Sequence, residues 1–230
     1  MSFSEFRAGT GRERRGSAAL RTRLLRGAHA AVLRHGVDAA GIGEIAAAAG
    51  VPAATVHRCF PSKESLVRAL VAEVVEGNGA AVERAVGTPE DPAAAVAAFV
   101  RQTVRMTERD PLLACLATGP HGLAEALTDD FSRRLLRSLS RGVWVGRFPV
   151  ASALVQLCAI RGAVLEVLRG RLQGQLPAAA ADELAAGVLQ MLGLPAGEAA
   201  AIAGRPLEPV PPPWPWAAGP PALSCVAGGH

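Results

Sequence analysis

The side chains of this chain that suit contact with a polyanion gather near its start. Residues 1–70 hold 11 basic and 5 acidic residues and so carry a net charge of +6, whereas the rest holds 13 basic and 15 acidic ones and carries −2. Within this basic segment, Arg58 lies at an exposed position of a short predicted helix. Its guanidinium can donate two parallel hydrogen bonds to guanine in a major groove, or bind a phosphate. This pattern predicts a phosphate-binding headpiece, and the alternative is a solvated basic tail with no partner.

The spacing of histidine, cysteine and carboxylate residues does not indicate a catalytic or metal site. No histidine, cysteine or carboxylate set has a recognisable catalytic spacing, and His29, His35 and His57 all fall in the basic segment. The four cysteines are scattered, with no C-x-x-C pair and no histidine at ligand spacing, which argues against a zinc site and a disulfide framework. We therefore expect no enzyme, no catalytic residue, no metal and no cofactor.

The composition indicates an all-α protein without a membrane span. Half of the residues are apolar, only 4% are aromatic, and no alternating run of Val, Ile and Thr predicts a strand. The most apolar long stretch, 150–168, is interrupted by Gln156, Arg161 and Glu166, so it predicts a buried helix rather than a membrane span. The N-terminus has no apolar core of a signal peptide, so we expect a cytoplasmic protein.

The elements that must position this guanidinium lie in residues 42–63. The pattern predicts two short helices joined by a turn at Gly50, where glycine adopts the left-handed backbone without a Cβ clash. Val56 and Phe60 lie four residues apart on the second helix and face inward. Ser62 is expected to cap a third, long helix. Helix, glycine turn, short helix and long helix form the layout of a helix-turn-helix DNA reader.

These residues resemble the DNA-binding segment of the tetracycline-repressor (TetR) family of bacterial transcriptional regulators. The resemblance runs from about Leu20 to Val71 and rests on a first helix that closes on Gly36, followed by I-A-x-x-A-G-V, T-x-x-x-x-F and S-K-E-x-L. It implies a helix-turn-helix headpiece followed by a helical body for ligand binding and dimerisation. Beyond Val71 it extends only to this general plan.

The resemblance also implies which residues contact DNA. Thr55 matches a position whose hydroxyl commonly touches phosphate, and Lys63, the only lysine of the chain, matches a basic residue that also contacts phosphate. His57 can donate to a phosphate, and does so more strongly when protonated. The predicted DNA-binding residues are Ala53, Ala54, Thr55, His57, Arg58 and Lys63.

Three positions depart from the family pattern. His57 stands where tyrosine is usual, Cys59 stands where histidine or tyrosine is usual, and Ala40 and Gly41 replace the hydroxyl residue that normally caps the first short helix. Cys59 is a poor hydrogen-bond donor and is interpreted as a packing residue, and the lost cap removes a backbone partner. These changes predict weaker or differently balanced DNA binding. They also motivate an alternative, a helical ligand-binding protein of the same fold with weak or lost DNA binding.

The residues after the headpiece predict a helical body. The last two long helices, at about 150–172 and 178–192, are rich in small residues, which lets helices approach closely within one subunit or across a two-fold axis. We expect a homodimer formed through these two helices. The first helix is expected to begin at Ser17. The expected domains are a flexible basic arm at 1–16, a DNA-binding domain at 17–70, a ligand-binding and dimerisation domain at 71–204 and a proline-rich tail at 205–230.

A pocket for an unknown small molecule is expected in this body, and ordinary core packing is the alternative for each candidate. Arg161 is the sharpest case, because a cation in an apolar helix needs a partner. Glu166, an acid on another helix or an anionic ligand would supply it. The candidate pocket residues are Phe99, Met106, Leu116, Phe131, Trp144, Leu157 and Arg161.

These patterns together predict a sequence-specific DNA-binding transcriptional regulator, a repressor, whose operator affinity is modulated by a small molecule. A two-fold dimer would place two second helices in successive major grooves of a palindromic double-stranded operator, about 34–36 Å apart. The effector can shift DNA binding only by its differential affinity for the two arrangements of the protein.

Overall fold

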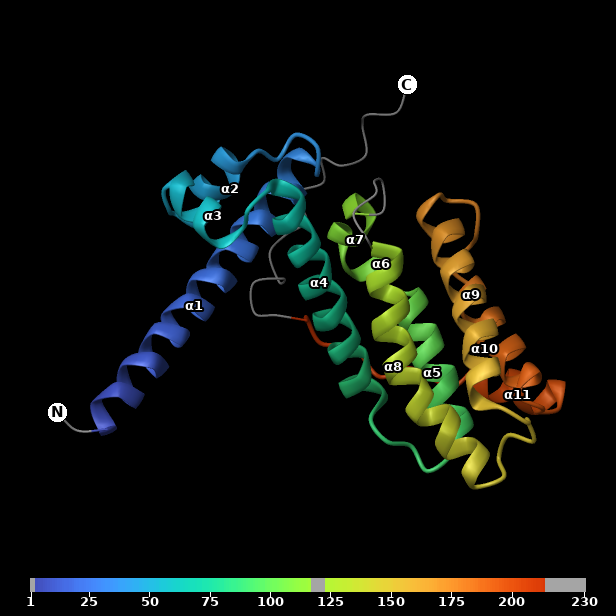
Figure 1. Ribbon diagram of the computed structural model, residues 1–230. Helices are drawn as coiled ribbons and strands as arrows, with labels where there is room; N and C mark the ends of the chain where they lie inside the picture. The colour runs from blue at the N-terminus through green and yellow to red at the C-terminus, as the bar shows by residue number, and fades with distance from the viewer. Residues whose placement is uncertain (1–2, 117–122, 214–230) are drawn as a thin grey trace. The chain divides into compact units, whose positions relative to one another are not determined.

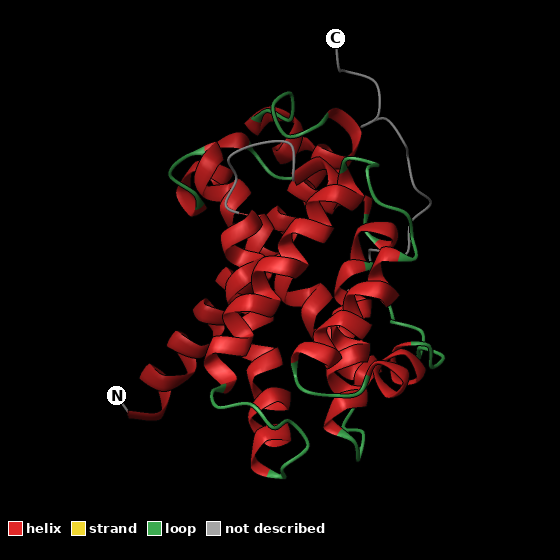
Figure 2. Cartoon of the chain, turned by 90° about the vertical axis from the view of Figure 1, so that its right-hand side faces the viewer, coloured by secondary structure: helices red, strands yellow, loops and turns green. Residues whose placement is uncertain are grey.

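The computed structural model of the chain describes residues 3–116 and 123–213, and every regular element among these residues is a helix (Figure 2). The prediction of an all-α fold is therefore confirmed. The helices labelled in Figure 1 are α1 (Phe3–His35), α2 (Ile42–Ala49), α3 (Ala53–Cys59), α4 (Lys63–Val86), α5 (Pro92–Val104), α6 (Met106–Arg109), α7 (Pro111–Leu116), α8 (Leu123–Trp144), α9 (Ala153–Leu172), α10 (Ala180–Met191) and α11 (Ala196–Ala203). None of the helices described is both long enough and apolar enough to pass through a membrane.

The chain divides into two compact units, and the division falls inside α4, between Val71 and Ala72. The first unit holds α1, α2, α3 and the first turns of α4. The second holds the rest of α4 and the helices that follow it. A helix-turn-helix headpiece is thus followed by a helical body, as the sequence predicts.

The headpiece is built around the turn between α2 and α3. Gly50 follows α2 with φ 62° and ψ 41°, the left-handed conformation that a Cβ would make costly. Its N–H donates to the carbonyl of Ala47 at 3.0 Å, and the next N–H donates to Ala46 at 3.0 Å, so the end of α2 is closed by backbone bonds. Val56 and Phe60 are buried, as their spacing predicts.

The N-terminal segment differs from the flexible arm that the sequence predicts at 1–16. The first helix is expected from Ser17, but α1 begins at Phe3 and runs without a break to His35. Arginine and glutamate are good helix formers and the segment holds no proline. Its glycines weaken a helix by about 1 kcal/mol each without ending it. Gly36, with φ 80°, ends α1 where the sequence predicts.

The helix α1 crosses α2 at a distance that only glycine permits. A Cβ on Gly27 would lie 2.8 Å from the Cβ and the N of Ala49 and 2.8 Å from the carbonyl oxygen of Ile45, and backbone atoms cannot turn aside. Arg23 donates from Nε to the carbonyl of Ala49 at 2.6 Å and from Nη2 to the carbonyl of Gly50. A cation at the C-terminal end of α2 also interacts favourably with the negative end of the helix dipole. α1 therefore both covers α2 and closes its end.

A reciprocal cap starts α4. The Ser65 N–H donates to the Ser62 hydroxyl and the Ser62 N–H donates to the Ser65 hydroxyl, both at 3.2 Å, so two backbone donors at the helix start are satisfied. The predicted cap at Ser62 is confirmed. Hydrogen bonds from its own backbone N–H and from Ser62 hold the pKa of Glu64 below its usual range, and the ionised carboxylate suits the first turn of a helix.

The body is organised around α5, which is buried along most of its length. Asp91 caps its start by accepting from the Ala93 N–H at 2.9 Å. Its apolar residues join those of α8, α9 and α10 in one core, which includes Val96, Val100, Leu135, Leu139, Ile160 and Leu189. Ala181 and Ala185 of α10 are fully buried in this core. One of the two small-residue faces therefore serves packing within the subunit.

The segment after α11 is tied to the body. Arg101 of α5 is 5% exposed and donates to the carbonyl of Arg205 at 2.6 Å. Val210 packs against the core. The first residues of the proline-rich tail predicted at 205–230 therefore belong to the body, because a buried guanidinium needs their carbonyls as acceptors. Residues 214–230 lie outside the described chain.

The substitution Gly27→Ala should destabilise the headpiece by about 1–3 kcal/mol, because overpacking against backbone atoms forces α1 away from α2. Thermal unfolding followed by circular dichroism measures the change. The control is Gly43→Ala, at an exposed position inside α2 where an added Cβ meets nothing within 4 Å. That control should raise stability by up to about 1 kcal/mol. Equal unfolding midpoints for the two variants would contradict the close crossing.

Candidate functional site

The exposed side of α3 carries most of the residues that the sequence predicts for DNA contact. Ala53, Ala54, His57 and Arg58 are exposed, whereas Val56 on the opposite side is fully buried. The single apolar anchor is enough to orient a helix of seven residues whose last carbonyls are closed by the next segment. α3 therefore presents its polar side to solvent, as a helix that enters a groove must.

Thr55 and Lys63 are half-buried. Arg58 donates to the Thr55 hydroxyl at 3.4 Å, a long hydrogen bond that holds the guanidinium only weakly. Lys63 donates from Nζ to the carbonyl of Asp38 at 2.7 Å. An ammonium has three donors, so this bond orients Lys63 and leaves donors for a phosphate.

Two arginines of α1 support the headpiece, and sequence reasoning does not single them out. The guanidinium of Arg21 lies over the ring of Phe60, 5.0 Å from its centroid, in cation–π geometry. Arg23 bonds the end of α2, 26 residues along the chain. Helical periodicity gives no signal for either contact, because both partners belong to other helices or to the residues that end them.

The departures from the family pattern lie where the sequence places them. Gly41 is the N-cap residue of α2 and makes no side-chain cap to the helix. His57 is exposed, so its imidazole is available to an external acceptor, and Cys59 is half-buried. The interpretation of Cys59 as a packing residue agrees with this burial.

A narrow hollow lies between α5, α8 and α9 in the body. Its wall is apolar except for two threonines and one arginine. It is lined by Thr103, Leu127, Thr128, Phe131, Arg161, Val164, Leu165 and Leu168. The free volume of this first hollow is about 10 Å³, roughly the room of a single water molecule, so its side chains nearly fill it.

Arg161 lines the first hollow and is half-buried. Glu166, the neighbour that the sequence offers as its partner, instead accepts from Arg169. In the part of the chain that the structure describes, no acid forms an ion pair with Arg161. The ion pair with Glu166 is therefore absent, and the anionic ligand considered from the sequence stays a prediction.

The other predicted pocket residues are divided. Met106, Leu116 and Leu157 are buried and do not line the first hollow, so core packing accounts for them. Phe99 lines a second hollow. Trp144 is 87% exposed, and its predicted place in a pocket is wrong, because α8 extends to this residue and carries it beyond the core.

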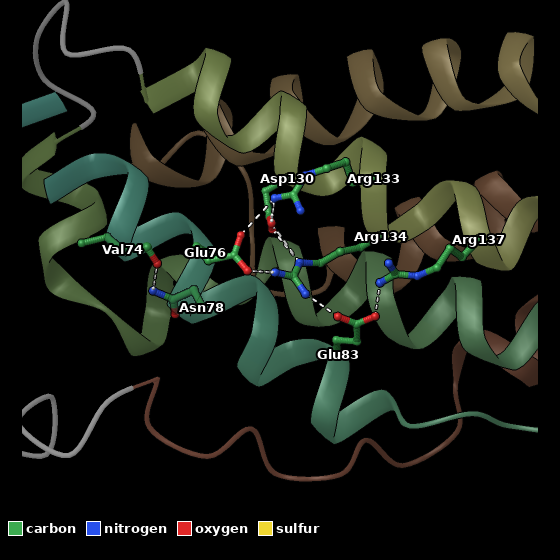
Figure 3. A network of polar contacts seen from close by, with 8 residues as sticks. All are labelled: Val74, Glu76, Asn78, Glu83, Asp130, Arg133, Arg134 and Arg137. Atoms are coloured by element: carbon green, nitrogen blue, oxygen red, sulfur yellow. Dashed lines mark hydrogen bonds and ion pairs between the residues drawn. The ribbon is translucent and has the colours of Figure 1, made fainter. Parts of the chain in front are cut away.

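A cluster of charged side chains joins α4 to α8 (Figure 3). Arg134, 8% exposed, donates to Asp130 at 2.9 Å, to Glu76 at 2.7 Å and to Glu83. Arg137 donates to the other carboxylate oxygen of Glu83. A buried guanidinium is tolerated only with such matched acceptors. We call this set of residues, with Arg133, the α4–α8 ion cluster.

Burial and hydrogen bonding act in opposite directions on the charges of this cluster, and for Asp130 burial prevails and raises the pKa. The hydrogen bond from Arg133 holds the pKa of Glu76 below its usual range, against the opposing effect of burial. Burial by itself would lower the pKa of Arg134, but the hydrogen bond to Asp130 and the charges of the acids raise it. Gly79 leaves the room that the cluster needs, since a Cβ there would lie 2.0 Å from Oδ2 of Asp130.

The sequence does contain a signal for this cluster. Glu76 and Glu83 lie seven residues apart, as do Asp130 and Arg137, so each pair shares one helix face. Nothing in the sequence tells which faces meet. Among the described residues, no three His, Cys, Asp or Glu side chains are grouped as the ligands of a metal ion would be.

Two family models match the chain over most of its length. The model of bacterial regulatory proteins of the tetR family matches residues 24–70, and the model of the tetracyclin repressor-like C-terminal domain matches residues 91–205. The chain belongs to the TetR family. The resemblance seen in the sequence is thereby confirmed, and it extends from the headpiece into the body.

Known relatives agree with this assignment. The crystal structure of RolR without ligand is 27% identical, covers 83% of this chain and 100% of its own, and has a TM-score of 0.70. RolR in complex with resorcinol is 26% identical, covers 86% and 99% of the two chains, and has a TM-score of 0.72. The transcriptional repressor LfrR of Mycolicibacterium smegmatis is 52% identical over 46 residues, which are 20% of this chain and 24% of LfrR. The match to LfrR therefore spans about a quarter of that repressor.

Proposed function

We propose that this TetR family member is a repressor that binds a palindromic DNA operator as a homodimer and releases it when a small molecule binds the body. The observation that supports this best is the exposed side of α3, where His57 and Arg58 project from a helix anchored by Val56. Arg58 reads a guanine. The phosphate contacts come from Thr55, His57 and Lys63. The protein acts in the cytoplasm and catalyses no reaction.

An exposed apolar stripe on α9 supports the homodimer. Leu154 and Val155 are 61% and 65% exposed, and the exposed small residues Cys158, Ala159 and Gly162 continue the stripe at spacings of three and four. A helix that is buried on one side and apolar on the other has a second surface to cover. The same stripe on a second copy meets this need across a two-fold axis, and the small residues let the two helices approach closely.

The substitution Val155→Arg should convert the dimer into a monomer, because it places two charges near each other in an apolar contact. Light scattering coupled to size-exclusion chromatography gives the mass directly. The control Ala201→Arg adds the same side chain at an exposed position of α11 and should leave the mass unchanged. A Val155→Arg dimer at micromolar concentration would rule out α9 as the interface.

The first hollow is the proposed effector site. The similarity to RolR, which binds resorcinol in its complex, favours a compact aromatic effector with hydroxyl groups. The ring suits the apolar wall, and its hydroxyls can bond to Thr103, Thr128 and Arg161. Because the free volume is about 10 Å³, such a molecule binds only if the surrounding helices move. A ligand that prefers the moved arrangement shifts DNA affinity by its differential affinity.

Resorcinol should release the protein from its operator, and Arg161→Ala should raise the half-maximal concentration about tenfold, the effect of losing roughly 1.4 kcal/mol of hydrogen bonding. Fluorescence anisotropy of labelled operator measures the release. The control Arg169→Ala removes an exposed arginine of the same helix that does not line the first hollow and should respond as wild type does. If resorcinol leaves the complex intact, the proposed class of effector is wrong. That result would leave the proposal of DNA binding standing.

The alternative, a protein of the same fold with weak or lost DNA binding, is favoured by one observation. α2 has no side-chain cap at Gly41, which removes a hydroxyl from the side of the headpiece that the family uses for phosphate contact. Each lost phosphate contact lowers affinity without changing sequence preference. The two functions differ in whether a discrete site is bound.

Binding to the DNA upstream of its own gene across a salt series decides between them. The regulator should bind a discrete site, with affinity falling steeply as salt rises. Lys63→Ala should weaken all sequences alike and reduce the salt slope by about 1, whereas Arg58→Ala should cost about 1–3 kcal/mol of preference at one base pair. Undetectable or salt-independent binding would establish the alternative, and an unchanged preference in Arg58→Ala would remove its base-reading role.

A further inference from the structure

A second hollow lies where the end of α4 meets α5 and α8. Its free volume is about 210 Å³, far more than that of the first hollow. The side chains that matter for its chemistry are Glu83, Phe99, Arg134, Arg137, Ser138 and Arg141. The remaining wall includes Val86 and Ala95. The two hollows share no lining residue, and the ring of Phe99 packs on that of Phe131 of the first hollow, with centroids 5.4 Å apart.

The charge of this hollow is not balanced. Three guanidinium groups and one carboxylate line it. Arg134 is matched by Asp130 and Glu76 in addition to Glu83 (Figure 3). Arg141 donates to the backbone carbonyls of Pro89 and Glu90, at 2.8 Å each. These carbonyls carry no formal charge and do not neutralise the guanidinium. The hollow is therefore positive, with a wall that is partly apolar.

We propose that the second hollow binds a small organic anion, a carboxylate or sulfonate carried on an apolar ring or chain. The oxyanion accepts from Arg137 and from the Ser138 hydroxyl, and Arg141 adds its charge. The apolar part lies against Phe99, Val86 and Ala95. Guanidinium groups suit such an oxyanion because their planar donors match two oxygens at once.

Glu83 competes with the ligand for this site. Its carboxylate already accepts from Arg134 and Arg137, so it stands where the ligand's oxyanion binds. The side chain of Arg137 is 63% exposed and can turn toward a ligand, whereas the side chain of Arg134 is buried and stays with its acids. The ligand therefore competes with Glu83 for Arg137. Because Glu83 belongs to α4, the occupied site weakens one link of the α4–α8 ion cluster.

Fluorescence titration of the full-length protein with 8-anilinonaphthalene-1-sulfonate tests the site. The matched neutral probe is N-phenyl-1-naphthylamine, which has the same ring system without the sulfonate. We expect saturable binding of the sulfonate and at least tenfold weaker binding of the neutral probe, the loss of one charge-assisted contact. Equal affinity for the two probes would overturn the proposal, since it would mean that only apolar contact is involved.

Substitutions place the anion in this hollow. Arg137→Gln should weaken sulfonate binding about threefold to tenfold, and Glu83→Gln should tighten it by removing the competitor. The control Arg84→Gln makes the same charge change on an exposed residue of α4 that neither lines the hollow nor belongs to the α4–α8 ion cluster, and it should bind as wild type does. Circular dichroism verifies that each variant is folded.

Three outcomes of these titrations would contradict the proposal. If Arg137→Gln and Arg84→Gln weaken binding equally, the effect is one of overall charge. If Arg161→Gln weakens binding and Arg137→Gln does not, the anion occupies the first hollow. If Glu83→Gln binds no more tightly than wild type, the carboxylate is not a competitor. No DNA is present in these titrations, so their outcome is independent of the proposed repressor function.

Discussion

The buried guanidinium of Arg134 constrains how α4 and α8 pack in the body. Removing a guanidinium from water costs several kcal/mol unless its donors are met by well-placed acceptors. Asp130 on its own helix and Glu76 and Glu83 on α4 supply them, so α4 must lie against α8 along at least two turns. The absence of a side chain at Gly79 is part of the same constraint, because the carboxylate of Asp130 occupies the space of a Cβ. The helix that begins in the headpiece is thereby held by charge rather than by apolar packing alone.

The headpiece is held by a different constraint, the close approach of two helices. Gly27 and Ala49 bring α1 and α2 into backbone contact, beside buried larger side chains such as Leu24 and Ile45. Arg23 then satisfies carbonyls at the end of α2 that this crossing covers. These contacts leave α3 with one buried anchor and a free polar side, which is the arrangement that reading a groove requires.

The two hollows of the body differ in the way a regulator can use them. The first has an apolar wall and a free volume of only about 10 Å³, so a ligand larger than water can occupy it only if the surrounding helices rearrange. The second has a free volume of about 210 Å³ and a positive wall, and its carboxylate belongs to the α4–α8 ion cluster. The rings of Phe99 in the second hollow and Phe131 in the first pack against each other in a tilted arrangement, so a shift of one ring is felt by the other.

The sequence by itself determined the local features of this protein. Gly50, Ser62 and the spacing of Val56 and Phe60 specify the helix-turn-helix, because caps, turns and helix faces depend on residues within four positions of each other. The sequence wrongly predicted that Trp144 lines a pocket and that the first helix begins at Ser17. An apolar side chain can be buried or exposed, and a glycine can end a helix or lie within one, depending on the surrounding structure. The ion cluster and the two hollows depend on partners more than fifty residues apart, such as Arg134 and Glu76. Periodicity shows that each helix has a charged or apolar face, but only the tertiary structure decides which faces meet, since that choice depends on close packing and on the matching of every buried charge.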